Sequence, residues 1–310
     1  MGFIDLHGGL GRKFGSIGLS LEEPATVVNV RQANTLEAHG AGGERALVYA
    51  KHVLEGLGIH TGVVIQMHEA IPEHAGLGSG TQCALAVGMA VARAYGHPLS
   101  VREVAALVQR GKRSGIGIAA FEQGGLLVDG GLGEHTDTPP LLARMDFPEH
   151  WDVLLVMEPE LRGVHGEQES RAFVELPPFA ASDAAAIARL VLMKVLPGVA
   201  EGDLSAFGEG VREIQRMLGI HFAPAQGGSM YSSPRVAKVM SYLEARGVKC
   251  VGQSSWGPTG FAVVESGPEL EKLVDDIRRL VPELNYKICK ARNQGSVVRQ
   301  EVTADETALA

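Results

Sequence analysis

The chain has few cysteines and no long apolar run. Three cysteines, Cys83, Cys250 and Cys289, are spread widely over 310 residues. An odd and small number of cysteines argues against a disulfide framework and favours a reducing compartment. No CxxC pair or Cys/His cluster is present, so a structural zinc site is not expected. No uncharged apolar segment reaches the roughly 18 residues of a membrane-spanning helix.

Basic charge is also scarce. The chain carries 28 Lys and Arg against 36 Asp and Glu, which gives a net charge of −8. An acidic chain lacks the broad positive field of nucleic-acid-binding proteins, so any anion must be held by local basic groups. The first residues include Asp5 and no basic leader, unlike a signal peptide. We therefore expect a cytoplasmic protein that binds small molecules, with neither nucleic acid nor a membrane as partner.

Glycine, by contrast, is abundant. The chain holds 40 glycines, nearly twice the usual share of about 7%. Strand and helix patterns alternate in both halves, and the composition shifts near residues 138–150. Length and pattern together predict an α+β fold with two domains. We place these domains at 1–148 and 149–300, followed by a flexible tail at 301–310.

The spacing of apolar residues predicts the individual elements. Ser100 is the expected N-terminal cap of one helix. We expect helices over 43–57, 81–95, 101–112, 182–196, 203–218, 234–246 and 268–281. We expect strands over 17–21, 26–30, 63–67, 124–128, 151–157, 248–251, 260–265 and 285–290.

One glycine-rich loop has the pattern of an anion site. The segment from Ile71 to Gln82 follows a predicted strand and leads into a helix of small residues. Its glycines, Gly76, Gly78 and Gly80, let the backbone approach a ligand closely. The N–H groups of such a loop and the positive end of the next helix bind anions, most naturally phosphate. The alternative is a tight strand-to-helix turn without a ligand. The loop is not a Walker A motif, which requires G-x-x-x-x-G-K-[ST].

This loop also carries a family resemblance. The pattern Pro72-x-x-x-Gly76-Leu77-Gly78-Ser79 resembles the phosphate loop of the GHMP kinase superfamily. The resemblance implies a two-domain fold of the GHMP-kinase type, to which the first domain contributes the phosphate loop at 72–82.

The resemblance departs from the kinases at their catalytic acid. Residues 111–116, Gly-Lys-Arg-Ser-Gly-Ile, resemble the next conserved stretch, after which the kinases carry a catalytic aspartate. Here that position is Gly117, followed by Ile118, and the nearest carboxylate is Glu122. A glycine cannot orient or deprotonate an acceptor hydroxyl. Because phosphoryl transfer depends on positioning and charge, the loss argues against an ordinary small-molecule kinase.

One branch of the superfamily is not a kinase. The chain resembles the β-ribofuranosylaminobenzene 5′-phosphate synthases of methanopterin biosynthesis over nearly its whole length. The most specific stretch is Gly-Gln-Ser-Ser-Trp-Gly-Pro-Thr at 252–259. Further matches lie at 3–8 with 15–18, at 74–82, at 162–167 and at 226–228.

The resemblance implies a decarboxylating transfer. Phosphoribosyl pyrophosphate and 4-aminobenzoate are joined as a C-riboside, while pyrophosphate and CO₂ leave. Departure of pyrophosphate needs neutralisation of charge, for which Mg²⁺ and N–H donors are expected. Since CO₂ rather than a proton leaves the ring, no general base is required, which agrees with the glycine at position 117. A homodimer also fits the family.

The resemblance and the residue chemistry together nominate the site. The expected catalytic residues are Asp5, Arg162, His165 and Glu167. The expected substrate-binding residues are Arg12, Gly76, Leu77, Gly78, Ser79, Gly80, Thr81, Gln82, Lys112, Arg113, Gln226, Gly227, Gly228, Gln253, Ser254, Ser255 and Trp256.

Structural alternatives stand beside these roles. Asp5 could cap the following glycine turn instead of binding Mg²⁺ or ribose. Arg12 could be a solvated turn residue, and Glu167 could lie at an exposed helix start. Trp256 could pack in the core rather than stack on an aryl ring. Cys83 is interpreted as a packed residue, since no activating base is evident.

Two other functions remain open at this stage. One is a true GHMP kinase that uses Glu122 or another acid as its base. The other is a phosphate-ligand-binding protein without catalysis. The sequence also does not choose between 4-aminobenzoate and 4-hydroxybenzoate, which differ in one para substituent.

Overall fold

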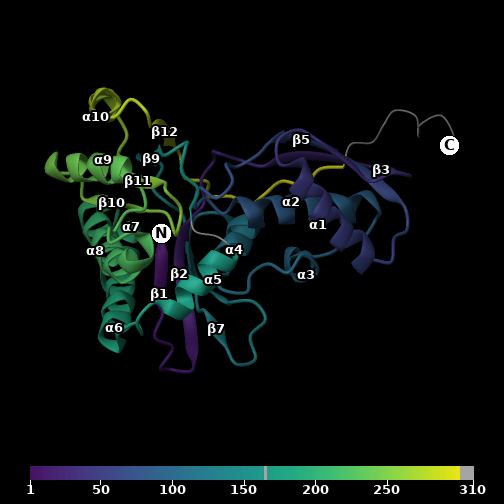
Figure 1. The fold of residues 1–310 in the computed structure, drawn as a ribbon, viewed down its shortest axis with the longest axis horizontal. Helices are drawn as coiled ribbons and strands as arrows, with labels where there is room; N and C mark the ends of the chain where they lie inside the picture. Colours follow the sequence, from purple (N-terminus) through teal and green to yellow (C-terminus); the bar gives the residue numbers. More distant parts are fainter. Residues whose placement is uncertain (164–165, 301–310) are drawn as a thin grey trace.

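The computed structural model describes residues 1–163 and 166–300, without the side chains of 167–170. Its strands form three sheets, and helices pack between and outside these sheets (Figure 1). The α+β class expected from the sequence is confirmed. No helix among the described residues is long and apolar enough to cross a membrane.

The first sheet lies in the middle of the molecule. Its strands are ordered β1-β2-β6-β8, and β7 pairs with the first residues of β2. All neighbouring strands run antiparallel. Their bounds are β1 Gly2–Asp5, β2 Arg12–Leu19, β6 Leu126–Asp129, β7 Leu132–Gly133 and β8 Leu141–Met145.

The second sheet forms the right-hand part of Figure 1 together with three helices. Its order is β3-β5-β4, in which β3 runs antiparallel and β4 parallel to β5. The strands are β3 Val27–Ala33, β4 Glu37–His39 and β5 Gly62–Glu69. The helices are α1 Gly43–Gly56, α2 Ser79–Ala94 and α3 Val101–Leu107, with α4 Ile116–Gln123 leading back to the first sheet.

The third sheet and most of the remaining helices form the left-hand part of Figure 1, while α5 lies in the middle beside β1 and β2. The strand order is β10-β11-β9-β12, antiparallel throughout. These strands are β9 Trp151–Met157, β10 Cys250–Gln253, β11 Gly260–Glu265 and β12 Asn285–Cys289. The helices are α5 Gly166–Glu175, α6 Ala181–Leu190, η1 Val191–Val195, α7 Leu196–Glu201, α8 Leu204–Phe222, η2 Ala223–Gln226, α9 Pro234–Ala245 and α10 Pro268–Leu280.

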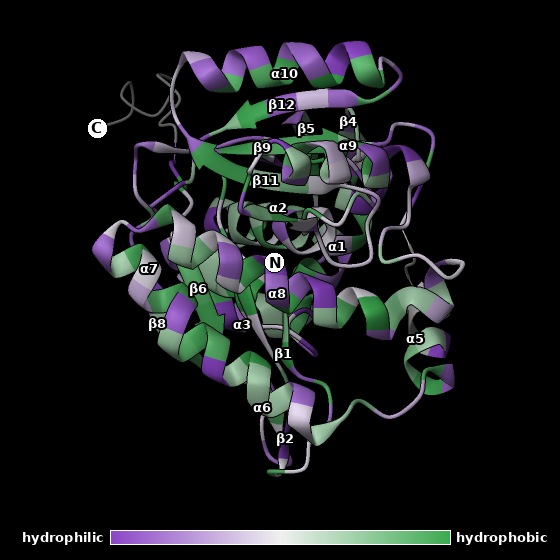
Figure 2. Ribbon diagram, turned by 90° about the vertical axis from the view of Figure 1, so that its left-hand side faces the viewer, coloured by the Kyte–Doolittle hydropathy of each residue, from purple (hydrophilic) through white to green (hydrophobic). Residues whose placement is uncertain are grey.

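Strand β9 is buried on both faces, which explains its unbroken run of apolar residues. Because side chains alternate along a strand, Val153 and Leu155 join one hydrophobic cluster while Leu154 and Val156 join another. The second cluster joins β9 and β11 to α9 and α10, and Figure 2 shows β9 as strongly hydrophobic. A strand covered on both sides has no polar face, so its sequence shows no alternation.

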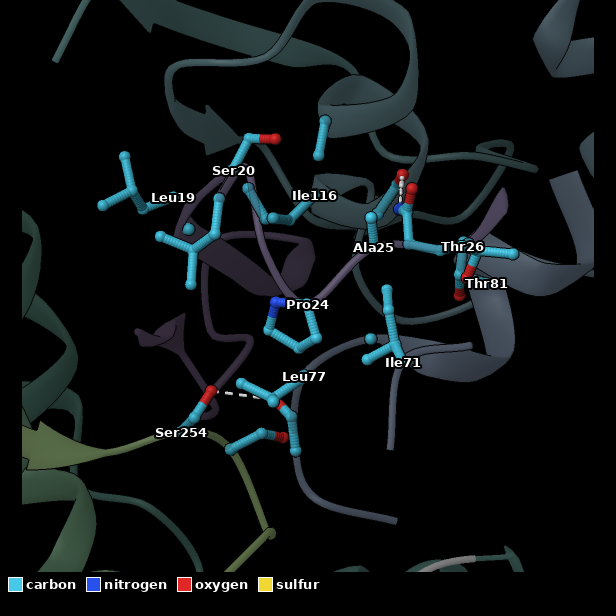
Figure 3. A pocket seen from close by; sticks show the side chains of 18 of the residues that line it. Leu19, Ser20, Pro24, Ala25, Thr26, Ile71, Leu77, Thr81, Ile116 and Ser254 are labelled. Carbon is cyan, nitrogen blue, oxygen red and sulfur yellow. Dashed lines mark hydrogen bonds between the residues drawn. The ribbon is translucent and has the colours of Figure 1, made fainter. Parts of the chain in front are cut away.

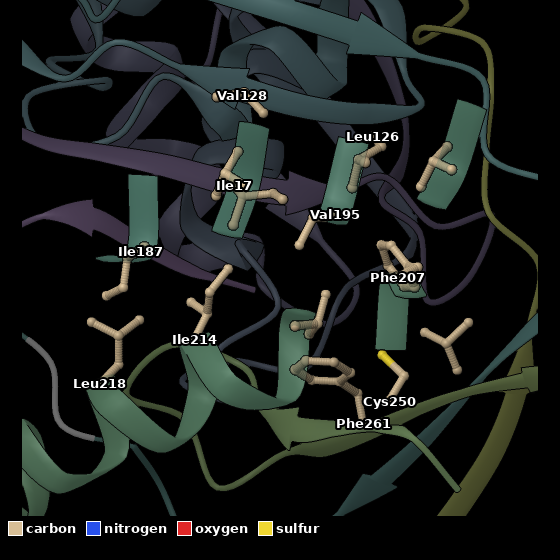
Figure 4. Packing of buried hydrophobic residues seen from close by; sticks show 14 of the residues in the cluster. Ile17, Leu126, Val128, Ile187, Val195, Phe207, Ile214, Leu218, Cys250 and Phe261 are labelled. Carbon is tan, nitrogen blue, oxygen red and sulfur yellow. The ribbon is translucent and has the colours of Figure 1, made fainter. Parts of the chain in front are cut away.

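The largest hydrophobic cluster joins the first and third sheets. Ile17 and Leu126 from the first sheet meet Phe207 and Ile214 of α8 within one buried cluster (Figure 4). This core takes residues from both sides of the expected boundary at 148/149. The boundary itself stays a prediction.

Most predicted elements are present, with shifted ends. Strand 260–265 agrees at both ends, and α2 begins at Ser79, two residues before the expected start. Ser100 caps α3 as expected, in a capping box with Glu103. That helix ends at Leu107 rather than 112, because Gln109 takes a left-handed conformation (φ 54°). The expected helix 182–196 is divided by the π-helical turn η1. Elements α4, α5, β4, β7, β8 and η2 were not predicted.

Candidate active site

The predicted phosphate loop is a left-handed turn into α2. Gly76 and Gly78 have φ values of 79° and 73°, a region that favours glycine. Gly78 is the N-cap of α2 and provides no side-chain hydrogen bond. The first N–H groups of a helix have no intrahelical acceptor, so those of Ser79 and Gly80 are available to a ligand. With the positive end of the helix, this geometry suits an anion.

A distant segment holds this loop in place. Ser254 donates its hydroxyl hydrogen to the carbonyl oxygen of Gly76, at 2.8 Å. A Cβ atom at Gly76 would overlap the carbonyl oxygen of Ser254, and one at Gly257 would overlap that of Ala75. The two segments therefore pack backbone against backbone, and glycine is required on both sides.

A third segment meets the same junction. The N–H of Gly163 donates to the carbonyl of His74 at 2.8 Å, and a Cβ at Gly163 would lie 2.6 Å from the Cα of Gly257. Arg162, directly before it, is exposed. Three stretches that carried the sequence resemblance thus come together here. The predicted residue His165 and the side chain of Glu167 lie outside the described residues.

Amide side chains connect two further predicted stretches. The Nε2 of Gln253 donates to the Oε1 of Gln226 at 2.7 Å. Ser232 donates its N–H to Gln253 at 2.7 Å and its hydroxyl to Gln226 at 2.6 Å. The N–H of Gln253 donates to the side chain of Gln215 at 2.8 Å. This network fixes the segment that precedes Ser254 and Ser255. Gly227 and Gly228 follow Gln226 in left-handed conformations.

A large cavity opens beside the loop. Its volume is about 2060 Å³, above the roughly 300–1,000 Å³ of an ordinary ligand pocket, so the space exceeds what one ligand of ordinary size needs. Figure 3 shows Leu77 and Ser254 on one side and Ile116 on another, with Pro24 between them. The wall includes Gly76, Leu77, Gly78, Thr81, Gln82, Gln226, Gln253, Ser254, Ser255 and Trp256 from the predicted substrate-binding set.

Gly117, at the kinase aspartate position, also lines this cavity. Gln82 donates its Nε2 hydrogen to the carbonyl of Gly117 at 2.8 Å. A Cβ atom at Gly117 would lie only 2.8 Å from the Cγ2 of Thr81, so the starts of α2 and α4 pack too closely for a larger residue. Glu122, the alternative acid, faces Arg102 at 3.6 Å and is not part of the described cavity wall.

A buried carboxylate supports the start of α4. Asp129 accepts hydrogen bonds from the N–H groups of Gly115 and Gly131, both at 2.9 Å, and from the hydroxyl of Ser114 at 3.1 Å. Burial raises the pKa of Asp129, and these three donors oppose that rise. Since Ser114 lines the cavity, Asp129 positions the wall from beneath.

Trp256 is packed rather than open. Its side chain is 4% exposed, and its ring centroid lies 4.3 Å from that of Phe222 and 5.4 Å from that of Phe173. Its Nε1 hydrogen has no partner among the described residues. Arg113 lies over the ring of Phe173, at 5.2 Å. The packing alternative therefore describes the structure, and stacking on an aryl ring stays a prediction.

Nine described residues of the predicted site are not part of the described cavity wall: Asp5, Arg12, Ser79, Gly80, Lys112, Arg113, Arg162, Gly227 and Gly228. Asp5 accepts hydrogen bonds from the N–H groups of His7 and Gly8, both at 2.8 Å, and so caps its own turn. Arg12 donates to the carbonyls of Gly130 and Gly131, both at 2.8 Å. The exposed Lys112 contacts Gln109 at 3.5 Å.

Two arginines that the sequence analysis missed lie at the start of α2. Arg45 and Arg110 each place a guanidinium nitrogen 3.3 Å from where a Cβ of Gly80 would be. They come from α1 and from the segment after α3. Neither belongs to a recognisable motif, so only the tertiary fold could reveal them.

The remaining groups to consider are the Cys83 thiol and side chains that could bind a metal ion. Burial raises the pKa of the Cys83 thiol, which agrees with a packed residue rather than a nucleophile. Among the described residues, no group of three or more His, Cys, Asp or Glu side chains could hold a metal ion.

Comparison with known proteins identifies the class. The family model of the GHMP kinases N terminal domain matches residues 45–125, and that of the GHMP kinases C terminal matches residues 195–283. A homoserine kinase from Cytophaga hutchinsonii is similar in structure, with a TM-score of 0.66 and 18% identity over 90% of both chains. A mevalonate pyrophosphate decarboxylase from Streptococcus pyogenes gives a TM-score of 0.67 and 12% identity, over 91% of this chain and 89% of that one. The fold is therefore that of the GHMP kinase superfamily, as the sequence predicted.

Closer relatives define the branch. A β-ribofuranosylphenol 5′-phosphate synthase of Archaeoglobus fulgidus is 36% identical over 94% of each chain. One of Methanocaldococcus jannaschii is 32% identical over 95% of this chain and 96% of the relative. The chain belongs to this synthase family, a branch of enzymes within the superfamily.

Proposed function

We propose that the protein joins phosphoribosyl pyrophosphate to 4-aminobenzoate, with release of CO₂ and pyrophosphate, as a step of methanopterin biosynthesis. The observation that carries this proposal is the contrast between two neighbouring features. The loop before α2 has left-handed glycines at positions 76 and 78, which suit an anion, while position 117 carries no carboxylate and a Cβ there would lie 2.8 Å from the Cγ2 of Thr81. A phosphate-binding cavity without that acid suits a reaction that needs no base.

The proposed chemistry begins at the anomeric carbon. Its bond to the pyrophosphate oxygen breaks, and the electron pair leaves with pyrophosphate. The N–H groups of Ser79 and Gly80 would bind that charge as it develops, where preorganised donors contribute most. The positive end of α2 acts in the same direction.

The second half of the reaction takes place on the ring. The ring carbon that bears the carboxylate forms the new bond to the anomeric carbon, on the face opposite the leaving pyrophosphate. The electrons of the carbon–carboxylate bond then restore the aromatic ring, and CO₂ leaves. No proton is removed in this sequence, so a glycine at position 117 is sufficient.

A dependence on Mg²⁺ belongs to the proposal. Magnesium commonly binds through one or two carboxylates together with substrate phosphates. When bound it would neutralise pyrophosphate charge. A homodimer and a cytoplasmic location likewise stay predictions.

The relatives' names favour a second candidate substrate. They describe a phenol product, which corresponds to 4-hydroxybenzoate in place of 4-aminobenzoate. The two acids would undergo the same transfer and decarboxylation, and only the para substituent differs.

Stoichiometry tests the proposal. The protein is incubated with Mg²⁺, phosphoribosyl pyrophosphate and either carboxyl-labelled acid, and both CO₂ and pyrophosphate are measured. Equal release of the two products is expected, and the ratio of kcat/KM for the two acids identifies the substrate. Turnover of ATP on an alcohol would support the kinase alternative. Binding of phosphoribosyl pyrophosphate without release of either product would support the non-catalytic alternative.

A further inference from the structure

Two arginine side chains converge on the start of α2. A nitrogen of Arg45 and a nitrogen of Arg110 each lie 3.3 Å from the position that a Cβ of Gly80 would occupy. They are therefore within twice that distance of each other. Like charges this close repel, and the positive end of α2 adds to the repulsion. The Glu73 carboxylate, 3.0 Å from Arg45, offsets part of this repulsion, and a bound anion would relieve the rest.

Both guanidinium groups are held in position by neighbours. Arg110 lies over the ring of the buried Tyr49, 5.2 Å from its centroid, and donates a hydrogen bond to the Tyr49 hydroxyl. Arg45 pairs with Glu73 at 3.0 Å, where its side chain is 27% exposed and that of Glu73 is 43% exposed. A guanidinium has five N–H donors, so these contacts leave donors for a ligand.

The position of the pair relative to the loop is also informative. The available N–H groups of Ser79 and Gly80 lie at the same helix start. Neither arginine is part of the described wall of the large cavity, which contains Gly76, Gly78 and Thr81. The loop therefore has two sides, an arginine side and a cavity side.

We propose that Arg45 and Arg110 bind a diphosphate group, together with the N–H groups that begin α2. A phosphate monoester has three acceptor oxygens. Two guanidinium forks and two N–H groups offer more donors than that, and each fork matches a pair of phosphate oxygens. The donor set thus fits a diphosphate better than a single phosphate. In naming pyrophosphate as the natural ligand, this inference rests on the proposed function.

Glu73 would compete with a bound anion for the guanidinium group of Arg45. Its carboxylate pairs with one guanidinium nitrogen of Arg45 at 3.0 Å and would repel an incoming anion. Neutralising it should therefore strengthen anion binding. A purely structural role of the Arg45–Glu73 pair predicts no such gain.

Calorimetric titration with inorganic pyrophosphate tests the site without requiring activity. Titrations are made without divalent cations, with inorganic phosphate for comparison. We expect pyrophosphate to bind at least about tenfold more tightly than phosphate. Arg45→Ala and Arg110→Ala should each weaken pyrophosphate binding by about ten- to a hundredfold, as expected for a lost charged hydrogen bond. Glu73→Gln should tighten it a few-fold.

A matched control separates this site from general loss of positive charge. Arg246 also lies over a tyrosine ring, 4.8 Å from that of Tyr242 on α9, and is remote from the loop. Arg246→Ala should leave pyrophosphate binding unchanged. If Arg110→Ala unfolds, Arg110→Lys keeps the charge but not the fork and should still weaken binding.

The outcomes distinguish this inference from the proposed function. Unchanged pyrophosphate affinity in the folded Arg45 and Arg110 variants would overturn the diphosphate site, even if the enzyme released CO₂. Weakened affinity in both variants, in a protein that releases no CO₂, would keep the site and refute the transfer reaction. Equal affinity of the native protein for phosphate and pyrophosphate would also contradict the inference.

Discussion

Two glycine-rich turns of this protein look alike in sequence and differ in structure. The turn between β1 and β2 places Asp5 and Arg12 around Gly8 and Gly11, while the loop before α2 contains Gly76 and Gly78. In the first turn, Asp5 accepts the N–H groups of the turn itself, and Arg12 donates to backbone carbonyls. In the second, the helix start has no side-chain cap. A polar turn that satisfies its own groups is structural, and one that leaves donors available suits a ligand.

The largest expected effect is a loss of kcat/KM when valine replaces a glycine in one of the two turns but not in the other. Gly11 and Gly78 have similar left-handed φ values, 80° and 73°, and a Cβ at either would meet no atom within 4 Å. A valine should therefore strain both turns to a similar extent. Only Gly78→Val places its side chain at the phosphate loop, so kcat/KM should fall at least about a hundredfold. Gly11→Val should retain activity.

Steady-state kinetics and thermal unfolding of both variants check this prediction. Equal losses of activity would mean that strain alone explains the effect, and the anion-binding assignment of the loop would be refuted.

The contrast also shows how far the sequence could predict the site. The turn before α2 could be predicted because its determinants are local: glycines at fixed spacing, then a helix of small residues. At Asp5 the same kind of pattern left two roles open, because residue types do not show which donors a turn satisfies internally. Arg45 and Arg110 were missed since their proximity to Gly80 depends on how α1, α2 and α3 pack. Gly117 was recognised only as a missing carboxylate, and its contact with Thr81 required the structure.

Two aspartates that accept backbone N–H groups provide the next comparison. Asp129 is 1% exposed and has three donors, while Asp5 has two in a more exposed turn. Asp129→Ala leaves buried donors without an acceptor and should lower the free energy of unfolding by about 3 kcal/mol. Asp5→Ala should cost about 1 kcal/mol. Denaturant titration measures both values, and a larger loss for Asp5 would contradict this ranking.

The pH dependence of stability offers a separate test of Asp129. Because burial raises the pKa of Asp129, the folded state binds a proton more readily than the unfolded state. The stability that this provides is present at low pH and is lost as pH rises from about 3.9 through the folded pKa. The loss should be measurable as a difference between the native protein and Asp129→Ala, and its absence would mean that the donors offset the burial.

A smaller effect is expected at the contact between loops. Ser254→Ala removes one hydrogen bond to the carbonyl of Gly76, so stability should fall by about 1 kcal/mol and KM should rise as the loop loosens. Tyr286→Phe is a control, because it removes hydroxyl-to-carbonyl bonds between β12 and α10. The control should lose similar stability with KM unchanged. A rise of KM in both variants would point to global loosening instead.

No new activity is expected from a substitution at Gly117, and this result bears most directly on the reaction. Gly117→Asp restores the residue type of the kinases at the cavity wall, yet its Cβ would lie 2.8 Å from the Cγ2 of Thr81. The start of α4 must then shift, so we expect lower thermal stability and no ATP turnover. The double variant Gly117→Asp, Thr81→Gly removes the obstructing methyl and should recover part of the stability. If either variant phosphorylates an alcohol substrate, the cavity still holds a kinase geometry, and the loss of the carboxylate alone separates this branch from the kinases.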